Sequence, residues 1–177
     1  MKIDRNSKEN TMILYPKIYL ESIKEITIEF LKKNNIKGII LDVDNTLIDY
    51  DRKMVAGAEK WCDDLKEQGI KLCILSNTNK KDKVENVANK LKIPYLFLAK
   101  KPAKSGFIKA GNLLGLPNEN IAAVGDQIFT DVFGANRIGM FSILVKQVDK
   151  KDIFITRLKR PIEKIVIKSY LNKRRKE

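Results

Sequence analysis

The chain of 177 residues contains no histidine and only two cysteines, and both shortages exclude common kinds of catalytic site. Without histidine there can be no Ser/His or Cys/His triad and no zinc site built on imidazole. The two cysteines, Cys62 and Cys73, match neither a metal-binding pattern nor a disulfide framework, so we expect buried free thiols. Chemistry is therefore left to carboxylates, hydroxyls, lysines and a hard metal ion.

Long apolar segments are missing as well. The run Ile70–Leu75 contains Lys71 and is far shorter than the ~20 residues that a membrane-spanning helix needs. The N-terminus has no apolar core of a signal peptide. The sequence therefore predicts a cytoplasmic protein. Its length suits one domain over residues 1–177, with a core over about 36–146.

Acidic residues are few relative to basic ones, and the net charge of +13 is concentrated at the C-terminus. From Lys150 to Glu177 there are eleven Lys and Arg but three Asp and Glu, a net charge of +8. Apolar residues recur there at helical spacing, which predicts a basic amphipathic helix over about 150–172, broken into two pieces by Pro161. Such a helix can lie on an anionic membrane surface, contact nucleic acid or pack its apolar stripe on its own domain, and the sequence leaves these open.

After about residue 36, short apolar runs alternate with longer stretches of helical periodicity. This βαβ rhythm predicts an α/β fold, a doubly wound parallel sheet covered by helices. An additional N-terminal helix is predicted from Pro16 to about Lys33. The predicted strands are Gly38–Val43, Ile70–Leu75, Tyr95–Leu98, Ile121–Val124 and Ser142–Val145. The predicted helices between them are Ala56–Gln68, Lys81–Leu91, Ser105–Leu114 and Thr130–Ile138.

The most informative motif is the pair Asp42 and Asp44, which stands at the end of a continuously apolar strand. Because strand side chains alternate between the two faces, residues two apart emerge on the same side and can converge on one ligand. One carboxylate can then attack phosphorus while its neighbour protonates the leaving oxygen and later activates water. Taken alone, the same residues also fit an ordinary turn at a strand end.

The ends of the next three predicted strands carry the other groups that phosphoryl transfer needs. Ser76 and Asn77 offer a hydroxyl and main-chain amides for phosphoryl oxygens. Lys101 precedes a proline that restricts its main chain, and its ammonium can neutralise phosphate charge. Asp126 and Asp131 are suited to a divalent cation. Since ligands of doubly wound sheets bind beyond the carboxyl ends of the strands, we expect all these groups in one site.

As a set, these residues resemble the four ordered motifs of the haloacid dehalogenase-like (HAD) phosphatase superfamily. More closely, the chain is similar to the YqeG family over roughly Met12–Lys168, most clearly in the run from Gly125 to Arg137. The resemblance implies an HAD-like Rossmannoid fold and a Mg2+-dependent phosphatase. One departure concerns the substrate side, because this chain has Thr78 and Lys83 where the family pattern has asparagine and arginine.

The resemblance also implies a role for each motif residue. Asp42 would be the nucleophile and Asp44 the general acid and base. Ser76 and Asn77 would bind phosphate, and Lys101 would pair with the phosphoryl group. The implied Mg2+ ligands are Asp42, the main-chain carbonyl of Asp44, and Asp126, with Asp131 assisting.

Neither of the two usual insertion points for a cap domain holds one, so we expect a capless, open site. An open site suits a phosphate carried on something large, such as a lipid head group, a protein or a nucleic acid end. The basic C-terminal helix favours a lipid, on the inner face of an anionic membrane. YqeG-like proteins are similar to mitochondrial phosphatidylglycerophosphatases, which implies phosphatidylglycerophosphate as substrate. A soluble phosphatase of nucleotides, sugar phosphates or phosphoproteins, and a non-enzymatic basic module that binds RNA, are the alternatives.

Overall fold

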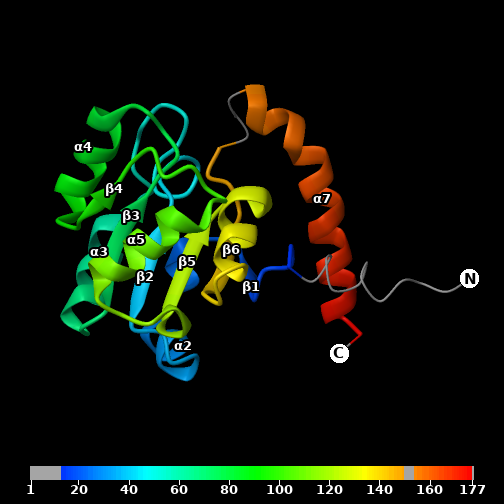
Figure 1. Ribbon diagram of the computed structural model, residues 1–177, viewed down its shortest axis with the longest axis horizontal. Helices are drawn as coiled ribbons and strands as arrows, with labels where there is room; N and C mark the ends of the chain where they lie inside the picture. Colours follow the sequence, from blue (N-terminus) through cyan, green and yellow to red (C-terminus); the bar gives the residue numbers. More distant parts are fainter. Residues whose placement is uncertain (1–12, 150–153, 177) are drawn as a thin grey trace, which may run out of the picture.

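Six parallel strands form one sheet in the order β1-β6-β5-β2-β3-β4 (Figure 1). The structure, a computed structural model, describes residues 13–149 and 154–176, and the side chains of the last helix from residue 160 onward. The parallel α/β sheet that the sequence predicts is confirmed. The strands are β1 (Ile18–Leu20), β2 (Gly38–Leu41), β3 (Lys71–Leu75), β4 (Tyr95–Leu96), β5 (Ile121–Gly125) and β6 (Phe141–Val145).

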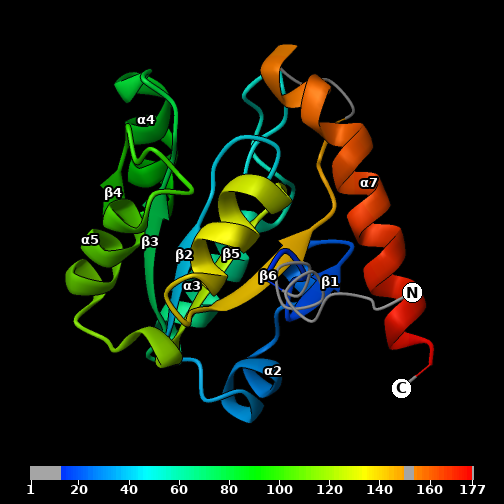
Figure 2. The ribbon, with the colours of Figure 1, turned by 45° about the vertical axis from the view of Figure 1, so that its right-hand side comes forward.

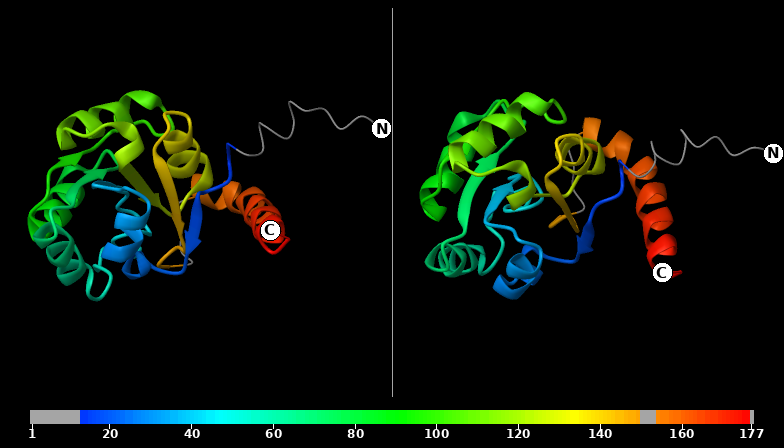
Figure 3. Two further views of the ribbon diagram at one scale, coloured as in Figure 1. Left: turned by 90° about the horizontal axis from the view of Figure 1, so that it is seen from below. Right: turned by 60° about the horizontal axis from the view of Figure 1, so that its bottom comes forward.

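Helices cover both faces of this sheet (Figure 3). One face packs against α2 (Ile28–Lys33), α3 (Ala58–Glu67) and α4 (Lys81–Leu91). The other face packs against α5 (Lys104–Leu114) and α6 (Phe133–Asn136). The last helix, α7 (Phe154–Arg174), runs beside β6 and β1 (Figure 2), where Val166 and Ile167 pack with Leu144 and Tyr19.

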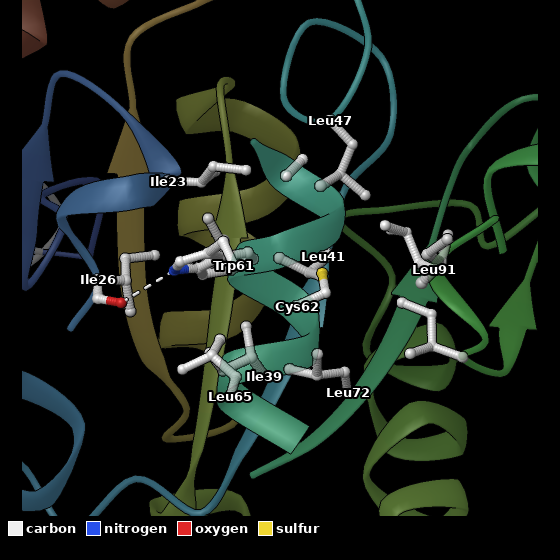
Figure 4. Close-up of a cluster of buried hydrophobic side chains, with 14 of the residues drawn as sticks. Ile23, Ile26, Ile39, Leu41, Leu47, Trp61, Cys62, Leu65, Leu72 and Leu91 are labelled. Atoms are coloured by element: carbon white, nitrogen blue, oxygen red, sulfur yellow. Dashed lines mark hydrogen bonds between the residues drawn. The ribbon is translucent and has the colours of Figure 1, made fainter. Parts of the chain in front are cut away.

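The larger core cluster lies between the sheet and α3 (Figure 4). The indole Nε1–H of Trp61 donates to the main-chain oxygen of Ile26 at 3.0 Å, so the buried polar atom of this large side chain is satisfied. Cys62 and Cys73 are buried free thiols, as predicted. Burial raises the pKa of each to about 12, which makes both unreactive as nucleophiles.

The N-terminal segment departs from the prediction. The helix expected from Pro16 to Lys33 is wrong: the chain instead forms edge strand β1, a 3-10 turn η1 (Ile23–Glu25) and the short helix α2. The side chains of Ser22 and Thr27 each cap a new helical turn, and both residues have extended main chains. A continuous helix cannot pass through two such caps.

The predicted break of the C-terminal helix at Pro161 is also wrong, because α7 is continuous from Phe154 to Arg174 with the proline inside it. The neighbouring Arg160 and Glu163 bond to the loop after β5, and these contacts hold the turn that the proline would otherwise weaken. The predicted beginning of this helix, at about residue 150, lies outside the described residues. That residues 1–177 form one domain stays a prediction. Within residues 13–149 and 154–176, no helix is long and apolar enough to cross a membrane.

Candidate active site

The candidate site lies where the strand order reverses, between β2 and β5. Asp42 directly follows β2, and Asp126 directly follows β5, which pairs with β2 in parallel. The main-chain N–H of Asp42 donates to the oxygen of Val124 at 2.9 Å and extends this pairing by one residue. Ligands of open α/β sheets bind at such a switch point, beyond the carboxyl ends of the strands.

Three carboxyl groups meet there. Asp42, Asp126 and Asp131 are buried, and one oxygen of each lies within 4.8 Å of the others. Asp131 reaches this cluster because the turn after β5 is wide: η3 (Ile128–Val132) is a π-helical turn rather than the start of the predicted helix Thr130–Ile138. Glycine is required at residue 125, since a Cβ there would overlap the Asp131 carboxylate.

The donor set fits a hard divalent cation. Oδ1 of Asp126 is buried and has no hydrogen-bond partner among the described residues. A buried polar atom without a partner is costly, and a metal ion bound by the three carboxylates would remove that cost. Oxygen-only ligands are the kind that Mg2+ and similar hard cations prefer.

Lys101 connects the cluster. Its Nζ donates to Oδ1 of Asp42 and to Oδ1 of Asp131, each at 2.6 Å, and its side chain is 3% exposed. Burial lowers the pKa of Lys101, but the carboxylates of Asp131 and Asp42 outweigh burial and raise it above its ordinary value. The side chain of Asn77 holds the lysine main chain in place, because it accepts from Lys101 N at 2.6 Å and donates to Lys101 O at 2.9 Å. The Lys101–Pro102 peptide bond is cis.

Burial also shifts the pKa of two of the carboxyl groups, those of Asp42 and Asp126. It raises the pKa of Asp42 to about 7, with Lys101 opposing the shift. It raises the pKa of Asp126 well above its ordinary value, with Arg160 opposing. A bound divalent cation acts in the other direction, because it favours the ionised form of every carboxylate that it touches.

These directions predict how the stability of the metal-free protein depends on pH. Between about pH 4 and pH 7 the folded protein keeps a proton on Asp42 that the unfolded chain has released. The free energy of unfolding therefore falls as the pH rises through this interval, and part of the stability present at pH 4 is lost above pH 7. Urea unfolding in the presence of a chelator at several pH values measures this. The variant Asp42→Asn should show a shallower decline, and an equally steep decline would contradict the assignment to Asp42.

The remaining predicted residues lie at the edge of the cluster. The carboxylate of Asp44 is 43% exposed and pairs with the ammonium of Lys83 from α4. Ser76 is buried, and its Oγ accepts from the N–H of Thr78 at 3.3 Å. The structure thus brings Asp42, Lys101, Asp126 and Asp131 into one cluster, with Asp44 at its opening and Ser76 and Asn77 on the neighbouring strand end.

Two residues of the site were missed by the sequence predictions, and both come from α7. Arg160 donates to the main-chain oxygen of Asp126 at 2.9 Å and pairs with Oδ2 of the same residue. Glu163, 2% exposed, accepts from the N–H groups of Ile128 at 2.8 Å and Phe129 at 3.3 Å. The available signal was Glu163 itself, a rare acidic residue in a strongly basic segment, three residues after an arginine.

In the part of the chain that the structure describes, no cap domain covers the site. Residues 42–57, between β2 and α3, form a loop held by two isolated bridges, Asp44 with Ile48 and Ile48 with Met54. Residues 97–103 connect β4 to α5 directly. The described residues therefore leave Asp44 accessible to a phosphate on a large molecule.

Comparisons with known proteins agree with this geometry. A family profile described as "Mitochondrial PGP phosphatase" matches residues 6–148. The "Probable phosphatase YqeG" of Bacillus subtilis (strain 168) is 39% identical over 159 residues, which cover 89% of this chain and 92% of that protein.

Solved structures show a related fold. The cobalt-bound deoxy-D-mannose-octulosonate 8-phosphate phosphatase (YrbI) of Haemophilus influenzae is 15% identical with a TM-score of 0.54, covering 78% of this chain and 91% of its own. A predicted HAD-like family hydrolase of Porphyromonas gingivalis is 16% identical with a TM-score of 0.52, covering 71% of this chain and 98% of its own. At these identities the likeness concerns the fold alone.

Proposed function

This chain belongs to the mitochondrial PGP phosphatase family and is an HAD phosphatase similar to YqeG, and from that membership we propose that it is a Mg2+-dependent phosphomonoesterase that acts through an aspartyl-phosphate on Asp42. The observation that carries the proposal is the buried cluster in which Lys101 bridges Asp42 and Asp131 beside Asp126. Such a cluster combines a nucleophile, a cation for the phosphoryl group and ligands for a metal.

The reaction proceeds in two displacements. A carboxylate oxygen of Asp42 attacks phosphorus, the ester P–O bond breaks, and Asp44 gives its proton to the leaving oxygen. Asp44 then removes a proton from a water molecule that attacks the phosphorus of the aspartyl-phosphate, which releases inorganic phosphate and restores the Asp42 carboxylate. Exposure of Asp44 fits proton exchange with solvent and substrate.

The other residues neutralise charge on the phosphoryl group and position the groups that bind it. Lys101 neutralises a phosphoryl oxygen, and Asn77 fixes the main chain of Lys101. Ser76 offers its hydroxyl to the phosphate. A bound Mg2+ supplies charge neutralisation at the phosphoryl oxygens. Its ligands would be the carboxylates of Asp42, Asp126 and Asp131, which lie together, and the family resemblance adds the main-chain oxygen of Asp44.

We propose a phospholipid head group such as phosphatidylglycerophosphate as the substrate, presented at an anionic membrane surface. On the outer side of α7, Ile162 and Ile165 are 55% and 68% exposed, and Lys164 and Lys168 are exposed beside them. Exposed apolar side chains among lysines suit the boundary between anionic head groups and acyl chains. The same helix contacts Asp126, so a membrane bound to its outer side would lie near the open site.

Phosphate release in the presence of Mg2+ tests this proposal. Phosphatidylglycerophosphate in anionic vesicles is compared with soluble phosphomonoesters, including nucleotides and sugar phosphates. We expect the lipid to be preferred, and we expect the double variant Ile162→Ser/Ile165→Ser to lower the rate on vesicles more than the rate on p-nitrophenyl phosphate.

Leu113→Ser is the matched control, because Leu113 is similarly exposed (49%) but lies on α5. A preference of orders of magnitude for a soluble phosphomonoester would overturn the lipid substrate and leave the phosphatase assignment intact. Binding of the protein to immobilised RNA, with no phosphatase activity toward any substrate, would instead favour the non-enzymatic module that binds RNA.

A further inference from the structure

The first turns of α7 are attached to the loop that carries two of the three clustered carboxyl groups. Figures 1 and 2 show the beginning of α7 at the same end of the molecule as the loops that follow β2 and β5. Arg160 contacts both the main-chain oxygen and a side-chain oxygen of Asp126. Nη1 of Arg160 also donates to Oε2 of Glu163 at 3.1 Å. Helix, loop and carboxylate therefore form one continuous network.

The two oxygens of Asp126 have different surroundings. Oδ2 pairs with Arg160, whereas Oδ1 is buried and has no hydrogen-bond partner among the described residues. The guanidinium is planar and rigid, so its contacts with the main-chain oxygen and with Oδ2 of Asp126 restrain the side chain relative to its own main chain. The contact thus leaves Oδ1 available for a cation.

Glu163 fixes the rest of the loop. Its Oε1 accepts from Ile128 N and Phe129 N, which are among the first N–H groups of the π-helical turn and have no partner within that turn. The same turn carries Asp131. Glu163 therefore restrains the segment between Asp126 and Asp131 from the helix side.

Charge balance in the network is consistent with a divalent cation. The carboxyl groups of Asp42, Asp126, Asp131 and Glu163 face two cations, Lys101 and Arg160. Full ionisation leaves two negative charges, which one divalent cation balances. Burying such charges is costly, and Val166, Ile167 and Tyr170 already supply apolar packing for α7. Packing alone does not explain why Glu163 is buried and why the side chain of Arg160 is only 14% exposed.

We propose that Arg160 and Glu163 are positioning residues of the metal site, which orient Asp126 and hold the loop 126–131 so that its carboxylates can bind a divalent cation. The inference rests on the metal-dependent activity proposed above. It makes α7 part of the active site, although this helix lies beyond residues 6–148 that the family profile matches.

Calorimetric titration of the full chain with Mn2+ tests the proposal. Loss of a residue that orients a metal ligand typically lowers metal affinity about 10- to 100-fold, and we expect this for Arg160→Ala and Glu163→Gln. Arg160→Lys should retain part of the affinity. Added guanidinium ion should restore binding in Arg160→Ala, which a general loss of folding would not allow. Arg175→Gln, at an exposed position just after the end of α7, removes an arginine without touching the loop and is the matched control.

Hydrogen exchange of main-chain amides, measured in the presence of a chelator, tests the proposal on the metal-free protein. The amides of Ile128 and Phe129 should exchange faster in Glu163→Ala, which removes their common acceptor, than in the wild type or Arg175→Gln. Unchanged or higher Mn2+ affinity in Arg160→Ala would overturn the proposal, and higher affinity would mean that the arginine competes with the cation. If Arg160→Ala does not fold, Arg160→Lys and Glu163→Gln decide by the same criteria. Failure of the wild type to bind Mn2+ would instead contradict the proposed metal dependence.

Discussion

Replacing Asp42 with asparagine is expected to lower turnover by at least about 10^4-fold while the protein stays folded. An amide oxygen cannot attack phosphorus as a carboxylate does, and loss of a catalytic nucleophile commonly has effects of this size. Asparagine has nearly the same shape, and Lys101 keeps its bond to Asp131. Above pH 7 the metal-free variant should be at least as stable as the wild type, because it no longer buries an ionised Asp42.

Steady-state phosphate release and thermal unfolding, measured on the same preparation, check this prediction. Asp51→Asn is the matched control, since Asp51 is exposed in the loop between β2 and α3. Wild-type turnover by Asp42→Asn would remove Asp42 from the nucleophile's role. Loss of turnover together with loss of folding would show that Asp42 is needed for structure rather than for chemistry.

Replacing Lys101 with methionine is expected to have the largest effect on stability. The variant leaves Asp42 and Asp131 buried without the cation that they share. Breaking a buried ion pair by removing one partner typically costs about 3–5 kcal/mol. Turnover should be lost as well, because the phosphoryl group loses the ammonium proposed to neutralise it.

The destabilisation should depend on pH. At pH 5 the carboxyl group of Asp42, whose pKa burial raises, can bind a proton and so avoid burying an unpaired charge, whereas at pH 8 it cannot do so at low cost. The loss in free energy of unfolding should therefore be smaller at pH 5 than at pH 8. Lys104→Met on the exposed surface of α5 is the control. A Lys101→Met variant as stable as the wild type at pH 8 would contradict the paired arrangement.

Much of the sheet and the cluster could be predicted because both depend on local patterns. Asp42 and Asp126 directly follow strands, and Lys101 lies in the loop after β4. Parallel strands bring such positions to one edge of the sheet. Asp131 is also buried in the cluster, because the wide turn after Gly125 carries it there. In these segments, periodicity and chain order together determine which side chains meet.

The parts that could not be predicted depend on contacts between distant segments. Strand β1 pairs with β6 at the opposite end of the chain, and three apolar residues fit a strand as well as a helix. Helix α7 continues through Pro161, and the preceding Arg160 contacts Asp126, which lies 34 residues earlier. No spacing within α7 indicates which residue its arginine will contact.

The most direct test of the account is the identity of the phosphorylated residue. We suggest Asp44→Asn, which lacks the base proposed for the second displacement, with p-nitrophenyl phosphate, whose leaving group needs no proton. After acid quenching, we expect a hydroxylamine-sensitive phosphoryl group on the peptide that contains Asp42. A phosphoryl group on any other residue, or turnover without a covalent intermediate, would contradict it.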